Sequence, residues 1–205
     1  MTPNLRISPM EFSESDLRAW KNGKYSLVKD CSRPLKQILR KKACARPGSR
    51  FFGEAFVAAH VDHEEGWYGS FKWLTSPKWY GDQTLEDRYQ AKFRDALRRN
   101  FPDLMAFQQI AAASMRKLGG RKPVGPDLWL ITPGKHRFIE VKLPYDRLGR
   151  HQLFGLALIA LFFRSDRPVS VEIVNLHSGK KPARSDQLAR QFEAICTRLK
   201  RRLEP

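Results

Sequence analysis

The fold of this chain is decided by residues 125–142, which read GPDLWLITPGKHRFIEVK. Two short apolar runs flank a Pro-Gly pair, and this pattern predicts two antiparallel strands joined by a tight turn. A turn centred on the Pro-Gly pair places Asp127 opposite Glu140, where Cβ atoms are roughly 5 Å apart. Because side chains alternate along a strand, Lys142 shares a face with Glu140. We therefore expect two carboxylates and one ammonium group at one end of a sheet face.

Such a cluster can support phosphodiester hydrolysis. Paired carboxylates bind a hard divalent cation such as Mg²⁺, and the cation lowers the pKa of a bound water and neutralises charge on a phosphate. A nearby lysine can orient the water or hold a phosphoryl oxygen. The alternative is that Asp127 only helps to form the turn after Gly-Pro. The Glu-x-Lys pair would then lie on a solvent-exposed face of the strand. Glu140 and Lys142 interrupt the apolar run 138–143, and a buried charge there needs compensation, which favours the metal site.

The residues of this stretch resemble the PD-(D/E)xK nuclease signature, in which Pro126-Asp127 is followed by Glu140-Val141-Lys142. A longer string is similar to the VRR-NUC branch of that superfamily. It consists of the Gly-Pro-Asp-Leu strand at 125–128, Phe-Ile-Glu-Val-Lys at 138–142, Asp146-Arg147-Leu148 and Gln152. Gly125 directly precedes Pro126, one residue closer than in the branch pattern. The resemblance covers roughly residues 84–176.

This resemblance implies an α/β fold with a restriction-endonuclease-like core, a mixed central sheet flanked by helices. It implies a Mg²⁺- or Mn²⁺-dependent DNA endonuclease that acts on branched or otherwise structured DNA. We expect Asp127 and Glu140 to hold the metal, with the carbonyl of Val141 as a third ligand. Lys142 is then expected to position or activate the attacking water. Repair, recombination, transposition and defence against foreign DNA all use this chemistry.

Two further site residues are implied. In the VRR-NUC branch a helix glutamate upstream of the Pro-Asp pair joins the metal site, and Glu86 is its expected counterpart here, with Asp87 as the alternative. Glu86 lies in the first turn of a helix predicted over residues 84–100, where an anion is also favoured by the helix dipole. Gln152 opens a later helix and is implied to lie near the metal cluster, where it helps to place a phosphate or Lys142.

Composition points to a nucleic-acid partner. The chain has 205 residues and a net charge of +17, with 41% hydrophobic and 11% aromatic residues. That composition is typical of a globular domain, whereas the charge favours a polyanion such as DNA. The three cysteines are widely spaced, which indicates a reducing compartment. No signal peptide and no membrane segment are predicted, so we expect a cytoplasmic or nucleoid-associated protein, or a nuclear one in a eukaryote.

We predict a basic N-terminal extension over residues 1–48 and a nuclease-like domain over residues 49–205, with its core at about 84–176. Within the extension, residues 34–42 predict a basic helix that is either a nucleic-acid-binding arm or a solvated face. The aromatic, Gly-punctuated segment 51–80 predicts short strands and turns, one of which joins the sheet. Its aromatic side chains either stack on bases or close a core.

From residue 84 the predicted order is helix, helix, strand, strand, helix, strand, helix. The helix that ends at Phe163 is apolar all round, so it is covered either by the sheet and the C-terminal helix or by a second subunit. The latter would make a homodimer, as some VRR-NUC-like proteins form. Two other functions are open: a non-catalytic nucleic-acid-binding module, and a structural subunit of a larger DNA-processing machine with protein partners.

Overall fold

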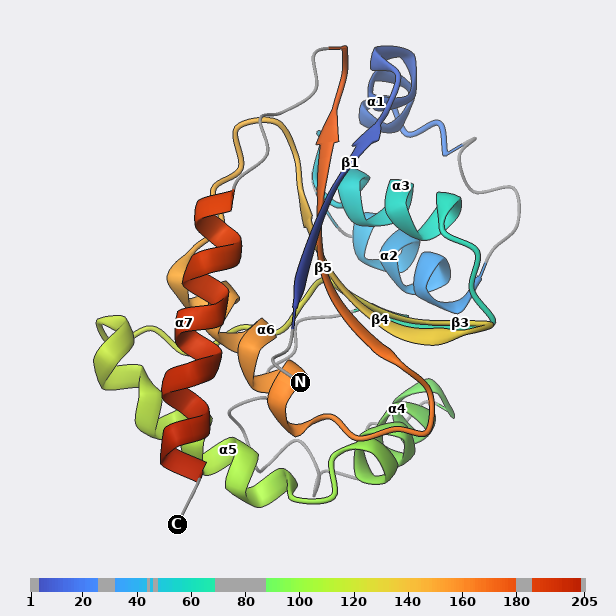
Figure 1. The fold of residues 1–205 in the computed structure, drawn as a ribbon. Helices are drawn as coiled ribbons and strands as arrows, with labels where there is room; N and C mark the ends of the chain where they lie inside the picture. Colours follow the sequence, from blue (N-terminus) through green and yellow to red (C-terminus); the bar gives the residue numbers. More distant parts are fainter. Residues whose placement is uncertain are drawn as a thin grey trace.

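The computed structural model describes residues 4–25, 32–43, 45, 48–68, 88–179 and 186–203. These residues form an α/β fold around a five-stranded mixed sheet with the order β1-β5-β4-β3-β2 (Figure 1). The β2–β3 and β3–β4 pairs are antiparallel, whereas β4–β5 and β1–β5 are parallel. The strands are β1 Leu5–Glu11, β2 Glu65–Tyr68, β3 Leu128–Thr132, β4 Lys135–Lys142 and β5 Val169–His177.

The hairpin of β3 and β4 has the predicted register. Leu128 pairs with Ile139 and Thr132 with Lys135, so the turn is centred on the Pro-Gly pair. The Thr132 hydroxyl donates a hydrogen bond to the Lys135 carbonyl at 3.0 Å, which closes the turn. The register matters because a slip of one residue would move every side chain to the other face of the sheet.

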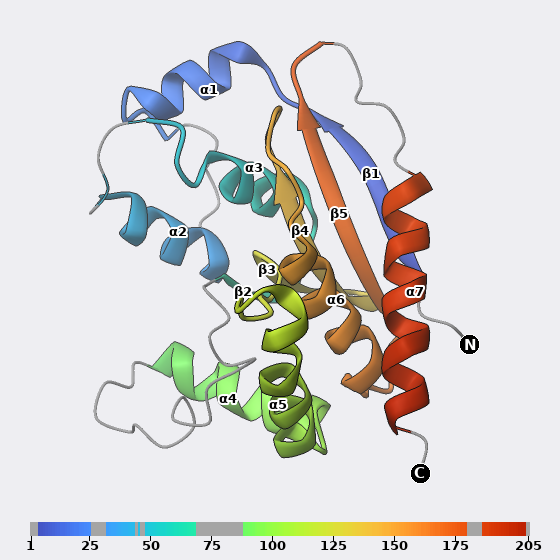
Figure 2. The ribbon, with the colours of Figure 1, turned by 90° about the vertical axis from the view of Figure 1, so that its left-hand side faces the viewer.

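Helices cover both faces of the sheet (Figures 1 and 2). One core lies under the first three helices and includes Leu128 and Ile139, while the other lies under the later helices and includes Trp129 and Phe138. The alternation follows the period of two along each strand. The helices are α1 Glu14–Lys21, α2 Arg33–Ala43, α3 Phe52–His60, α4 Arg88–Asn100, α5 Leu104–Ala113, α6 Arg150–Phe162 and α7 Asp186–Leu203, and a 3₁₀ helix, η3, spans Ser114–Leu118.

The apolar helix α6 is covered by the chain itself. It packs between the sheet and the helices α5 and α7, as the first of the two alternatives predicts. At Gly155 the helix touches the segment that leads into β3, because a Cβ there would lie 1.9 Å from the Val124 carbonyl oxygen. Val124 also donates its N–H to the His151 carbonyl at 3.2 Å. Helix α6 therefore packs against the segment that leads to Asp127.

Residues 1–48, which the sequence predicts as a basic extension, contribute to this same sheet and core. Strand β1 pairs in parallel with β5, and Trp20 of α1 and Ile38 of α2 are fully buried beside α3. Ser13 caps α1 as its position suggests, since its hydroxyl accepts a hydrogen bond from Asp16 N–H at 3.1 Å. The basic helix 34–42 is present as α2.

The prediction of strands and turns over residues 51–80 is wrong for its first part. Residues 52–60 form helix α3, because Phe52, Ala55 and Phe56 at helical spacing bury one continuous stripe. The expected strand is β2, which pairs with β3 at the sheet edge. Residues 69–87 lie outside the described residues. No helix in the described part of the chain is both long and apolar enough to cross a bilayer.

Candidate active site

Asp127 is attached to β4 by its carboxylate. The β3–β4 pairing runs to Leu128 opposite Ile139, and one step further along both strands brings Asp127 beside Glu140. The Asp127 Oδ2 atom accepts a hydrogen bond from the Val141 N–H at 2.8 Å. This bond holds the side chain across the open end of the hairpin. The predicted convergence of Asp127 and Glu140 therefore follows from the turn register.

Glu140 is the buried centre of the cluster, with 2% of its surface exposed. Its Oε1 atom lies 2.8 Å from Lys142 Nζ and accepts a hydrogen bond from Gln152 Nε2 at 2.5 Å. The other amide atom of Gln152, Oε1, accepts from the Gly149 N–H at 2.9 Å, which satisfies the first turn of α6. Lys142 is 11% exposed. The structure thus brings Gln152 and Lys142 onto one oxygen of Glu140.

The carboxylates of this cluster raise one another's pKa. Burial raises the pKa of Asp127 well above its ordinary value, and the charges of Glu140 and Glu54 raise it further. Burial also raises the pKa of Glu140, which Lys142 opposes and which Glu54 and Asp146 reinforce. A local excess of negative charge therefore exists inside a chain of net charge +17. Such a cluster takes up either protons or a cation.

Glu54 belongs to this cluster, and the sequence did not single it out. It lies on α3, and its pKa is raised by burial and by Asp146 and lowered by Lys142 and Arg50. Its neighbour Gly53 brings the helix close to β4, because a Cβ there would lie 3.0 Å from Val141 Cγ1. The helical spacing of the apolar residues in 52–60 was the signal that could have placed Glu54 on a helix beside the site.

Glu86, the predicted helix carboxylate, and its alternative Asp87 lie outside the described residues. Their predicted roles stay predictions. The described part of α4 begins at Arg88.

The turn after β4 adds a carboxylate and an exposed ring. Asp146 N–H donates to the Leu143 carbonyl at 3.0 Å, and Asp146 Oδ2 accepts from the Leu143 N–H at 3.1 Å. Pro144 and Tyr145 are the central residues of this closed turn, and Tyr145 has a φ of 76°, a conformation that usually requires Gly or Asn. The Tyr145 side chain is fully exposed. The turn therefore keeps Asp146 near the cluster and displays an aromatic ring beside it.

Basic side chains border the cluster on two sides. Lys41 of α2 lies with Nζ 4.7 Å from the ring centre of Tyr68, and burial lowers the pKa of Lys41 while Glu54 opposes that shift. Burial, followed by the charges of Glu54 and Asp127, raises the pKa of Tyr68. On the α6 side, burial and the charges of Arg121 and Lys142 lower the pKa of His151. The margins of the site therefore suit a phosphate backbone.

In the described ranges, no three His, Cys, Asp or Glu side chains are gathered into a ready-made metal cage. One oxygen of Glu140 is already engaged by Lys142 and Gln152. The donor set of this site is instead two mutually repelling carboxylates together with backbone oxygen. That set suits a hard divalent cation that keeps several waters, as Mg²⁺ does.

Comparisons of this chain with protein-family models, with curated proteins and with solved structures found no match. The assignment of a function therefore depends on the residues and contacts described above.

Proposed function

We propose that this protein is a divalent-metal-dependent DNA endonuclease of the PD-(D/E)xK type. The observation that carries the proposal is the convergence of Asp127, Glu140 and Lys142 at the end of one hairpin, where Asp127 accepts from the Val141 N–H and Glu140 pairs with Lys142. The pKa values of Asp127 and Glu140 are both raised, by burial first and then by neighbouring carboxylates, which adds that the cluster lacks positive charge. A purely structural site would be expected to neutralise its buried charges within the fold.

The order of elements supports the same proposal. Helix α3, strands β2, β3 and β4, helix α6 and strand β5 follow one another around the sheet, as expected of a restriction-endonuclease-like core. Helices α4 and α5 are then an insertion between β2 and β3, and β1 is an added edge strand. In this interpretation Glu54 supplies the carboxylate that the VRR-NUC resemblance expects from a helix upstream of the Pro-Asp pair.

The residues present fit Mg²⁺ or Mn²⁺. Asp127 and Glu140 would hold the cation together with the carbonyl of Val141, and Glu54 would contribute from the helix side, directly or through water. The fit rests on the donor chemistry, because Glu54 raises the pKa of both Asp127 and Glu140 and Glu140 raises that of Asp127. Among the described residues, Lys142 is the cation that forms an ion pair within this set. When bound, the cation supplies Lewis-acid activation of water and neutralises charge on the phosphate.

Each of the remaining groups has a definite task. Lys142 is a donor at the carboxylate cluster, so it can orient the attacking water or hold a phosphoryl oxygen. Gln152 fixes the orientation of Glu140 and joins it to the start of α6. The basic margins at Lys41 and Arg121 would contact the DNA backbone, and the net charge of +17 would attract it. The resemblance favours branched or otherwise structured DNA as substrate.

The first test is cleavage of plasmid and branched DNA with Mg²⁺ by the wild type and by Lys142→Ala. We expect the substitution to reduce cleavage by roughly 100-fold or more, as loss of one charged donor in an active site does. Lys135→Ala is the matched control, because Lys135 lies on the same strand at its other end and contacts Glu172 at 3.8 Å. Cleavage by Lys142→Ala at the wild-type rate, with the fold intact by circular dichroism, would refute the mechanism.

A second candidate is a nucleic-acid-binding module without catalysis. It is favoured by the ion pair of Glu140 with Lys142 and by the hydrogen bond from Gln152, which satisfy one carboxylate oxygen without metal. Calorimetry with Mn²⁺ separates the two candidates. The nuclease binds Mn²⁺ and loses it in Asp127→Ala, whereas the module binds DNA equally well in both variants and takes up no metal at this site.

A further inference from the structure

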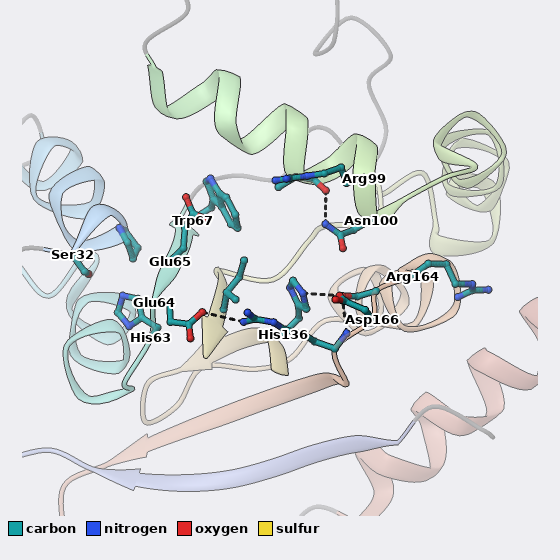
Figure 3. Close-up of a pocket in the computed structure, with 15 residues that line it drawn as sticks. Ser32, His63, Glu64, Glu65, Trp67, Arg99, Asn100, His136, Arg164 and Asp166 are labelled. Carbon is teal, nitrogen blue, oxygen red and sulfur yellow. Dashed lines mark hydrogen bonds and ion pairs between the residues drawn. The ribbon is translucent and has the colours of Figure 1, made fainter. Parts of the chain in front are cut away.

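A polar cavity of about 690 Å³ lies at the opposite end of the hairpin from the carboxylate cluster. Figure 3 shows its lining, which comes from the start of α2, the segment before β2, the end of α4 and the segment after α6. His136, at the start of β4, also lines it. Six residues of strand separate His136 from Lys142, which is roughly 20 Å at 3.3 Å per residue. The cavity is therefore separate from the candidate active site.

Two buried polar atoms in this cavity have no partner. Among the side chains that the structure describes, Ser32 Oγ and His63 Nε2 are the buried polar atoms without a hydrogen bond, and both residues line the cavity. His63 Nδ1 lies 2.6 Å from the Val61 carbonyl oxygen, which can only accept, so Nδ1 carries the proton. In the neutral ring Nε2 is then a bare acceptor. A buried polar atom without a partner costs roughly 1–3 kcal/mol, so a ligand group that reached either atom after a small shift of the wall would recover that cost.

On another wall of the cavity, the polar groups around His136 already have hydrogen-bond partners. Trp129 Nε1, which can only donate, lies 3.1 Å from His136 Nδ1, so the His136 proton is on Nε2 and points to Ser165 Oγ at 3.0 Å. Ser165 in turn donates to Asp166 at 3.1 Å. Burial and the charge of Arg167 lower the pKa of His136 and keep this ring neutral. Because these groups are bonded to one another, recognition of a ligand depends on the other residues of the cavity.

The cation left for a ligand is Arg99, at the end of α4. Arg167 contacts Glu64 at 3.0 Å and the Thr132 carbonyl at 3.3 Å, and Arg164 donates to the carbonyls of Leu161 and Phe163. Arg99 has no ion pair with any residue that the structure describes. A guanidinium group is suited to a phosphate or a carboxylate. A ligand of this cavity should therefore carry an anion toward α4.

We propose that this cavity binds a nucleotide. Its phosphate would meet Arg99. Its base would donate one hydrogen bond to His63 Nε2 and contact Ser32 Oγ, on the side of the cavity away from Arg99. Every natural base carries an N–H donor on its edge, and the sugar separates that edge from the phosphate. Inorganic phosphate can reach only the arginine, and a nucleoside only the opposite side. The volume is in the range of small-molecule sites, roughly 300–1,000 Å³.

The test is calorimetric titration of the full chain in EDTA, so that metal-dependent cleavage plays no part. We expect AMP to bind at least tenfold more tightly than either adenosine or inorganic phosphate. Arg99→Ala should weaken AMP binding about tenfold, which corresponds to about 1.4 kcal/mol. Its control is Arg98→Ala, since Arg98 is the neighbouring residue and pairs with Asp95 at 3.7 Å. Equal losses in the two variants, or binding of phosphate as tight as that of AMP, would overturn the proposal.

Ser32→Ala keeps the test independent of folding. Ser32 Oγ has no hydrogen bond to the described residues, so its removal should raise the melting temperature of the ligand-free protein or leave it unchanged, while AMP affinity falls severalfold. A lower melting temperature with unchanged affinity would contradict the assignment. A 5′-phosphorylated single strand, used as competitor, identifies the source of the nucleotide. Competition points to the end of a DNA strand, and its absence points to a free nucleotide.

Discussion

Glu140 and Glu172 are glutamates on neighbouring strands of one sheet, with 2% and 0% of their surface exposed, yet their pKa values shift in opposite directions. Burial tends to raise the pKa of Glu172, but hydrogen bonds from Arg137 and Ser170 and the charges of Arg137 and Lys135 outweigh it and lower that pKa. Arg137 Nε lies 2.9 Å from Oε1 and Nη2 lies 2.5 Å from Oε2. Among the residues that the structure describes, Glu140 has Lys142 as its one ion-pair partner, and other carboxylates lie close by.

The two sites show that two buried glutamates of one sheet can have different sets of partners. Glu172 is matched by a bidentate arginine, so its charge is satisfied inside the fold. Glu140 is left with a raised pKa in a cluster that has too little positive charge, and such groups are candidates for function. Burial alone therefore does not distinguish a structural carboxylate from a functional one, whereas the set of partners does.

The largest expected effect is loss of stability in Glu172→Gln. The substitution leaves Arg137 partly buried without its anion, and we expect the free energy of unfolding at neutral pH to fall by roughly 3 kcal/mol. Because the pKa of Glu172 is lowered from 4.5, this loss should shrink as pH falls below that value. Glu140→Gln is the control in urea denaturation, with a change within about 1 kcal/mol. A larger loss in Glu140→Gln than in Glu172→Gln would reverse the comparison.

A gain of stability is expected for Asp127→Asn in EDTA. The raised pKa of Asp127 means that its protonated form contributes stability below about pH 3.8, and this contribution is lost as pH rises through the raised value. Asparagine can still accept the Val141 N–H, so at neutral pH we expect the variant to be about 1 kcal/mol more stable. Mg²⁺ should raise the melting temperature of the wild type and not that of the variant. Equal Mg²⁺ responses in thermal melts would contradict this.

The smallest effect concerns the orientation of Glu140 by Gln152. Gln152→Ala removes one hydrogen bond to a buried carboxylate and one helix-capping bond, and should cost about 1 kcal/mol of stability and about tenfold in cleavage. Gln152→Glu keeps an acceptor for the Gly149 N–H but sets a carboxylate against Glu140, so the pH dependence of cleavage should move to higher pH. An unchanged pH profile in Gln152→Glu would show that Gln152 does not act through Glu140.

Local patterns in the sequence are sufficient to predict the hairpin. A Pro-Gly turn and a period of two are short-range features, so they place Asp127, Glu140 and Lys142 together without any knowledge of the rest of the fold. The resemblance implies that Gln152 lies near the carboxylate cluster, and in the structure its amide donates a hydrogen bond to Glu140. Residues 104–118 form the predicted helix, although its last turn is 3₁₀.

Long-range packing accounts for what the sequence did not reveal. Glu54 reaches the site because Gly53 lets α3 lie on Val141, a contact between segments far apart in the chain. Its aromatic, Gly-containing surroundings predict strands and turns, since Phe is typical of strands and Gly of turns. The unpartnered Ser32 and His63 atoms also depend on tertiary packing, because their cavity is lined by six separate segments of the chain.

The pairing of β1 with β5 has a consequence for how this protein is made. Leu5 pairs with Val171, so β1 can pair only after β5, which lies far along the chain, has left the ribosome. Such distant pairings slow folding, and until they form the nascent chain exposes an unpaired edge of the kind that promotes aggregation. Because this distant pair completes the sheet, we expect slow recovery of the fold after dilution from denaturant.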